Sequence, residues 1–168
     1  IEPTMRGLRK ERIDYRGFLY FGLMKVGDEP YVIEYNVRMG DPEAQVVIPR
    51  MKSDLLEAMD AVGYQRLEKY QLALDDRSAA AVILASQGYP GKYVKGKSIT
   101  VPKGETDLHV FHAGTKWSDD QLITSGGRVM AVSALAGDFN QALSKVYRHI
   151  EKINFEGMYF RKDIGYDI

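Results

Sequence analysis

The chain has 168 residues with 23 basic and 23 acidic side chains, so its formal net charge is zero, and 45% of its residues are hydrophobic. This length suits one domain, or one small domain plus part of another, while the balanced charge and the lack of a long apolar run argue against nucleic acid and membrane as partners. The absence of cysteine excludes disulfides and thiolate metal sites and favours a reducing compartment, so we expect a cytoplasmic protein.

Residues 4–12 have the pattern of the middle of a helix. The chain begins with Ile1 rather than methionine, and no apolar segment of the signal-peptide type follows. We therefore expect the sequence to be an excised part of a longer protein.

A β-hairpin is predicted next. Residues 18–25 are apolar and rich in aromatic side chains, which is typical of a buried strand. Gly27, Asp28 and Glu29 supply turn chemistry, and residues 31–37 then form a second strand that returns beside the first.

Two helices are expected after the hairpin. Asp41 is a good N-cap, and Pro42 occupies the first helical position, where its missing N–H costs nothing. This helix should reach Ile48 before Pro49 interrupts it.

The second helix should begin at Ser53 as N-cap and close at Gly63. A helical connector over residues 64–78 is expected to lead to a boundary near residues 75–77. The apolar side chains that would share one face of the second helix are Leu55, Leu56, Met59 and Val62.

The remainder of the chain reads mainly as strands followed by one helix. Asp138 should cap that helix, since apolar residues recur at helical spacing from Phe139 to Ile153. A glycine-rich loop is expected near residues 88–96. The predicted strands are 79–86, 98–101, 108–111 and 128–135.

The stretch that carries chemistry lies on the second strand of the hairpin. Residues two apart on a strand point to the same face, so Glu34, Asn36 and Arg38 should project together, with Ile33, Tyr35 and Val37 on the opposite, buried side. A carboxylate beside an amide oxygen suits Mg²⁺, and a guanidinium matches phosphate oxygens. The alternative is an amphipathic strand with a solvated polar face.

The Gly40-Asp41-Pro42 sequence favours the chemical interpretation of that strand. A solvated strand does not require it, whereas a helix that begins there would present backbone N–H groups to anions.

Several further blocks of the sequence are informative when taken together: residues 15–24, 33–45, 50–55, 88–91, 110–116, 125–129 and 161–165. In this order they resemble the phosphoribosylamine–glycine ligase family of ATP-grasp enzymes over essentially the whole chain. Gly-Asp-Pro-Glu and the later blocks distinguish this family from other ATP-grasp ligases, which share only Glu-x-Asn-x-Arg.

The resemblance implies ligation of glycine to 5-phosphoribosylamine, with ATP split to ADP and phosphate and glycyl phosphate as the intermediate. It implies that Glu34 and Asn36 are ligands of Mg²⁺ (or Mn²⁺) and that Arg38 steadies the transferred phosphoryl group. Gly40, Asp41 and Pro42 would line the substrate side.

The family resemblance also associates Arg161, Lys162 and Asp163 with the ribose-phosphate site. The alternative interpretation of these three residues is a solvated charged tail.

The implied fold is α/β (α+β). Residues 1–75 would be the C-terminal portion of an ATP-grasp domain, and residues 76–168 a small β-rich mixed C-terminal domain. Family members carry N-terminal domains that hold the nucleotide phosphates, so we expect this chain by itself to be inactive. The alternatives are another ATP-grasp carboxylate–amine ligase and a binding or scaffolding module without chemistry.

Overall fold

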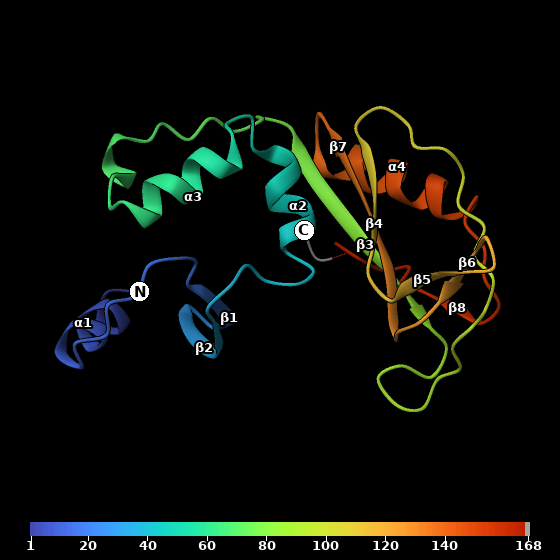
Figure 1. Cartoon of the computed structure of the whole chain (residues 1–168), viewed down its shortest axis with the longest axis horizontal. Helices are drawn as coiled ribbons and strands as arrows, with labels where there is room; N and C mark the ends of the chain where they lie inside the picture. Colours follow the sequence, from blue (N-terminus) through green and yellow to red (C-terminus); the bar gives the residue numbers. More distant parts are fainter. Residues whose placement is uncertain (167–168) are drawn as a thin grey trace. The chain divides into compact units, whose positions relative to one another are not determined.

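The structure is a computed structural model that describes residues 1–166 (Figure 1). The chain forms two compact units. Unit 1 contains Ile1–Ala44 and Met51–Leu74, and unit 2 contains Gln45–Arg50 and the chain from Asp75 onward. Within residues 1–166, no helix is long and apolar enough to cross a bilayer.

Unit 1 begins with α1 (Glu2–Lys10) and the predicted hairpin, which is confirmed. Strands β1 (Tyr20–Val26) and β2 (Glu29–Asn36) pair antiparallel through the turn at residues 27–28. The register slips once, because Gly22 is paired with Glu34 while Leu23 is paired with Val32. Ile33 is thus the extra residue of a β-bulge.

The prediction that one face of the second strand is buried is wrong for the described chain. Ile33, Tyr35 and Val37 are all exposed, with 63%, 52% and 70% of their surfaces accessible. A two-stranded sheet has no second layer of its own and needs a packing partner to bury a face. Within unit 1, the Tyr35 hydroxyl lies 3.2 Å from Thr4 Oγ1 and the Tyr35 ring packs edge-on against Phe21.

The first helix after the hairpin is shorter than predicted. Residues 41–43 form a turn, and α2 (Ala44–Val47) is a single turn followed by a 3₁₀ turn, η1 (Ile48–Arg50). The backbone N–H of Ala44 donates to the Gly40 carbonyl at 2.9 Å, which closes the turn. The predicted start at Pro42 is therefore too early.

Helix α3 (Leu55–Gly63) is capped by Asp54 and not by Ser53 as predicted. Asp54 Oδ1 accepts from the backbone N–H of Leu56 at 2.7 Å, whereas Ser53 Oγ accepts from the N–H of Ala73 at 2.6 Å. Ser53 does not cap the helix because its hydroxyl is hydrogen-bonded to the segment around Ala73.

The apolar face of α3 and the segment after it also differ from the prediction. Leu56 is 77% exposed, and the buried residues of the helix are Ala58 and Ala61. The segment predicted as a helical connector contains one short 3₁₀ turn, η2 (Leu67–Lys69).

Unit 2 is built on a four-stranded antiparallel sheet with the strand order β4-β7-β3-β8. Three predicted strands are confirmed in β3, β4 and β7, and Figure 1 shows α4 lying along this sheet. The elements are β3 (Ser78–Ser86), β4 (Leu108–His112), β7 (Arg128–Ala136), α4 (Phe139–Ile150) and β8 (Met158–Tyr159).

A second hairpin, formed by β5 (Thr115–Ser118) and β6 (Gln121–Thr124), was not predicted. The strand expected over 98–101 is wrong, because Ser98 and Thr100 make only isolated bridges.

The core of unit 2 lies between the sheet and α4. The predicted cap of α4 is confirmed, since Asp138 Oδ1 accepts from the Gln141 backbone N–H at 2.8 Å. The core residues with 2% or less of their surface exposed include Val82, Leu84, Val129, Met130, Val132, Ala134, Val146, Ile150 and Ile153.

An ion-pair network lies at the start of β3. The Arg77 guanidinium bonds Asp75 at 2.9 Å and Asp107 at 2.8 Å. Hydrogen bonds to the two carboxylates raise the pKa of Arg77, and the bond from Arg77 lowers the pKa of Asp107. The network joins the beginning of β3 to the residue that precedes β4.

Candidate functional site

The structure brings Glu34 and Asn36 together near the end of β2. Asn36 Nδ2 donates to Glu34 Oε1 at 2.9 Å, so the two side chains lie on the same face of the strand. Glu34 is exposed and Asn36 is half-buried. This places a carboxylate and an amide group side by side at an accessible point, and the carboxylate oxygens of Glu34 and the amide oxygen of Asn36 are the kind of ligand atom that a hard cation prefers.

Two protein oxygens fit the way magnesium binds. Mg²⁺ usually takes one or two carboxylates and completes its octahedral shell with water and phosphate oxygens. Among the described residues, no group of three or more His, Cys, Asp or Glu side chains could hold a metal ion.

Arg38 lies just beyond the end of β2 and is exposed. Its Nη1 donates to the backbone carbonyl of Met39 at 2.8 Å. A guanidinium has five N–H donors, so this bond occupies only part of its capacity. Arg38 is near Asn36 in sequence and retains donors for phosphate oxygens.

A residue that the sequence analysis missed, Gly22, makes room for Glu34. The two residues are paired across the hairpin. A Cβ atom built on Gly22 would lie 2.8 Å from Cγ of Glu34, closer than real Cβ atoms come to other atoms. The signal that could have found this residue is a glycine inside an otherwise apolar strand, which often marks close approach of another group.

We predict that Gly22→Ala displaces the Glu34 side chain and lowers the metal-dependent activity of the full-length protein by about 10-fold or more, as the loss of a supporting contact at a metal site usually does. Steady-state kinetics at varied Mg²⁺ concentration measure the effect. Gly7→Ala is the matched control, because nothing lies within 4 Å of a Cβ on Gly7. An unchanged Mg²⁺ dependence in Gly22→Ala contradicts the prediction.

Tyr20 and Glu43 also belong to this region, and the sequence analysis missed both. The Tyr20 hydroxyl donates to Glu43 Oε1 at 3.0 Å, and Tyr20 is paired with Asn36 across the hairpin. The hydrogen bond to Glu43, then burial and the negative charges of Glu43 and Glu34, raise the pKa of Tyr20. Both carboxylates therefore lie close enough to Tyr20 to favour its neutral form.

The predicted substrate segment Gly40-Asp41-Pro42 is a turn that follows the metal pair. Gly40 is buried and Asp41 is exposed. The expectation that a helix N-terminus here presents N–H groups to anions is wrong, because α2 is a single turn that starts at Ala44. Any role in binding substrate therefore has to come from the turn.

The Arg161-Lys162-Asp163 segment belongs to unit 2 and follows β8. Arg161 Nε and Nη2 donate to the two carboxylate oxygens of Asp163 at 2.9 and 2.8 Å. These bonds raise the pKa of Arg161 and lower the pKa of Asp163. The Arg161 carbonyl accepts from the Tyr147 hydroxyl at 2.9 Å, so the segment is held to α4.

The Arg161-Lys162-Asp163 segment lines a shallow cavity of about 530 Å³ together with Met158, Tyr159 and Phe160. The Arg161 fork is already paired with a carboxylate, so a phosphate group would compete with Asp163 for it.

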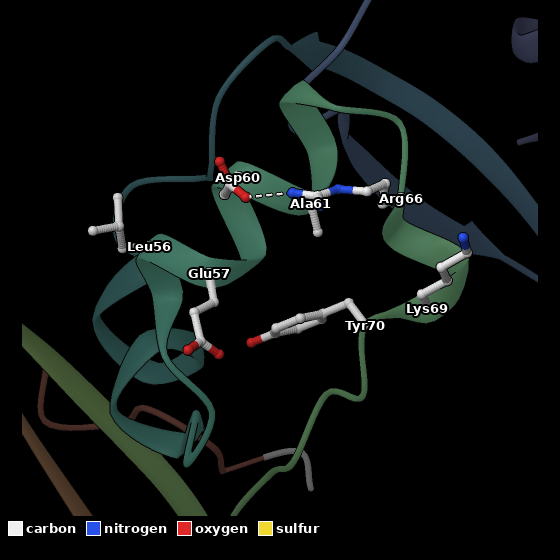
Figure 2. A pocket seen from close by; sticks show the side chains of 7 residues that line it. All are labelled: Leu56, Glu57, Asp60, Ala61, Arg66, Lys69 and Tyr70. Carbon is white, nitrogen blue, oxygen red and sulfur yellow. Dashed lines mark hydrogen bonds and ion pairs between the residues drawn. The ribbon is translucent and has the colours of Figure 1, made fainter.

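Another cavity in unit 1, of about 550 Å³, was not predicted and lies between α3 and η2 (Figure 2). Asp60 and Arg66 form an ion pair of 2.7 Å at its rim. Figure 2 shows Glu57 and Tyr70 pointing toward one another, and the Tyr70 hydroxyl donates to the Asp54 carbonyl at 2.9 Å. The polar groups that line this cavity thus hold the segment after α3 against the helix and its N-terminal end.

Comparisons with solved structures and family models define the class of protein. The fold is similar to that of a biotin carboxylase domain of a Hydrogenobacter thermophilus 2-oxoglutarate carboxylase, with a TM-score of 0.56 at 17% identity over 80% of this chain and 33% of that one. Residues 1–44 match the ATP-grasp (A) domain of phosphoribosylglycinamide synthetase. The α/β fold with an ATP-grasp portion is therefore confirmed.

Residues 79–167 match the C domain of phosphoribosylglycinamide synthetase. This match covers more than half of the chain, and the chain belongs to the phosphoribosylglycinamide synthetase family. The resemblance found from the sequence blocks is thus confirmed.

Relatives agree with this assignment. The phosphoribosylamine–glycine ligase of Chlorobaculum tepidum is 48% identical over 98% of this chain, and a trifunctional purine biosynthetic protein of Gallus gallus is 47% identical over 99% of it. A crystal structure of the ligase from Thermotoga maritima superposes with a TM-score of 0.82, at 38% identity over 95% of this chain.

The chain spans about 40% of the length of the Chlorobaculum and Thermotoga ligases and 17% of the trifunctional protein.

Proposed function

We propose that this chain is the C-terminal part of a phosphoribosylamine–glycine ligase that acts in purine biosynthesis. The full-length protein would join glycine to 5-phosphoribosylamine, split ATP to ADP and phosphate, and pass through glycyl phosphate. The observation that carries the proposal is the adjacent Glu34–Asn36 pair in a chain of this family. Another ATP-grasp ligase is disfavoured, since the family's own C domain covers residues 79–167.

Glu34 and Asn36 are the proposed ligands of Mg²⁺, with Mn²⁺ as an alternative ion. The ion would neutralise charge on the phosphate oxygens of ATP while a phosphoryl group moves. Glu34 supplies an exposed carboxylate, and Asn36 supplies an amide that is held against it.

Arg38 is proposed to hold the transferred phosphoryl group, because its remaining N–H donors match phosphate oxygens. Gly40, Asp41 and Pro42 are proposed to line the substrate side, since this turn follows the metal pair directly. Arg161, Lys162 and Asp163 are proposed to contact the ribose phosphate, with the shallow cavity beside them as support.

We propose the domain boundary at residues 75/76, with a portion of the ATP-grasp domain before it and the C-terminal domain after it. The start of the C-domain match at residue 79 supports this placement. The partners would be glycine, 5-phosphoribosylamine, ATP and the N-terminal domains of the same protein, in the cytoplasm.

The test is a ligase assay on the purified full-length protein. ADP should form only when glycine, 5-phosphoribosylamine and Mg²⁺ are all present. The 168-residue chain assayed alone should form none. ADP formation that does not depend on glycine would contradict the proposal, and turnover by the 168-residue chain would contradict the expected need for the other domains.

A further inference from the structure

We propose that Tyr20 and Glu43 form a positioning pair that holds the Gly40-Asp41-Pro42 turn beside the metal ligands. The inference rests on the proposed function and extends it to two residues that would touch neither metal nor substrate.

The first support is the place of Tyr20 on the hairpin. Tyr20 begins β1 and is paired with Asn36, the last residue of β2. Its side chain therefore starts from the strand position directly opposite a proposed metal ligand. Any group bound to the Tyr20 hydroxyl is fixed relative to that end of the hairpin.

The second support is the bond itself. The Tyr20 hydroxyl donates to Glu43 Oε1 at 3.0 Å in a partly buried setting, across 23 positions of sequence. A hydrogen bond to a carboxylate is stronger than one between neutral groups, and partial burial strengthens it further. The contact thus connects the residue after the turn to the strand before it.

The third support is the packing of Glu43 on the turn. A Cβ atom on Gly40 would overlap the Glu43 carboxylate, and Gly40 itself is buried. The backbone N–H of Ala44 also donates to the Gly40 carbonyl at 2.9 Å. One oxygen of Glu43 is thus bound to Tyr20 and the other lies against Gly40, which leaves the turn little freedom to move.

Loss of this pair should affect the substrate side more than the nucleotide side. The turn would shift relative to Asn36 while Glu34 and Asn36 keep their mutual hydrogen bond. The KM for glycine should rise and kcat should fall, while the KM for Mg²⁺–ATP should change little. A purely structural role would instead lower the thermal stability and leave the kinetic constants of the folded protein unchanged.

The test compares six variants of the full-length protein: Tyr20→Phe, Glu43→Ala, the double variant of these two, Glu43→Gln, Glu34→Ala and the control Tyr31→Phe. Tyr20→Phe should lower kcat/KM for glycine by about 10-fold, the usual effect of one lost bond to a charged acceptor. Tyr31→Phe is the matched control, since Tyr31 is an exposed tyrosine of the same hairpin, and it should stay within about 2-fold.

The double variant should be no worse than Glu43→Ala alone, because each change removes the same bond. Glu43→Gln, which keeps an acceptor oxygen, should retain more activity than Glu43→Ala. Additive losses, or kinetics of Tyr20→Phe that match those of Tyr31→Phe, would overturn the inference. Glu34→Ala distinguishes the two claims: if it stays active, the proposed metal site fails, whereas an inactive Glu34→Ala beside an unaffected Tyr20→Phe overturns only the positioning pair.

Discussion

Replacing Glu34 by glutamine in the full-length protein is expected to lower ligase turnover at least about 100-fold. The substitution keeps the shape and one oxygen but removes the charge that binds the cation. Loss of groups that merely support a metal ligand already costs about 10- to 100-fold, and the ion itself contributes several kcal/mol of charge stabilisation in the transition state. Turnover measured at saturating substrates and varied Mg²⁺ concentration tests this.

Glu29→Gln is the matched control, because Glu29 is an exposed glutamate at the other end of the same strand. It should leave turnover and Mg²⁺ dependence unchanged. Asn36→Ala should behave like Glu34→Gln, since its amide lies 2.9 Å from the Glu34 carboxylate. Wild-type Mg²⁺ dependence in both site variants would contradict the metal assignment.

Leu84→Ala should destabilise unit 2 by about 3 kcal/mol. Leu84 is fully buried in β3, and deleting such a side chain typically costs about 2–5 kcal/mol through lost transfer energy and the cavity left behind. Urea unfolding of the 168-residue chain, followed by far-ultraviolet circular dichroism, measures the change.

Val94→Ala serves as the control within the same unit. Val94 is 67% exposed, so its truncation should alter stability by less than about 0.5 kcal/mol. Equal effects of Leu84→Ala and Val94→Ala would show that the sheet and α4 do not form the cooperative core described above.

Elements with a strong local pattern could be predicted from the sequence. The apolar run of β3 and the capped helical spacing of α4 each contain their signal within about a dozen residues, and both formed as expected. The β5–β6 hairpin was missed because its strands have only four residues each. Its turn places Asp119 and Asp120 at positive φ, where glycine or asparagine is the usual signal.

Burial on the first hairpin could not be predicted from alternation. The bulge at Ile33 breaks the two-residue period, and burial depends on what packs against the sheet, which no local pattern encodes. The alternation therefore predicted that Ile33 and Val37 are buried, whereas both are exposed in the structure.

The candidate site likewise contains one contact that could be predicted from the sequence and one that could not. Glu34 and Asn36 are two apart on one strand, so their proximity follows from strand geometry and was predicted. Tyr20 and Glu43 are 23 positions apart, and their contact arises only when the hairpin and the following turn fold together. The spacing of residues could not reveal that contact.

The measurement that tests the account most directly is complementation of purine-requiring cells that lack this ligase. The full-length gene should restore growth without added purines, while well-expressed Glu34→Ala and Asn36→Ala variants should not. Failure of a well-expressed wild-type gene to rescue would contradict the proposed ligase activity, and rescue by both variants would contradict the metal site at Glu34 and Asn36.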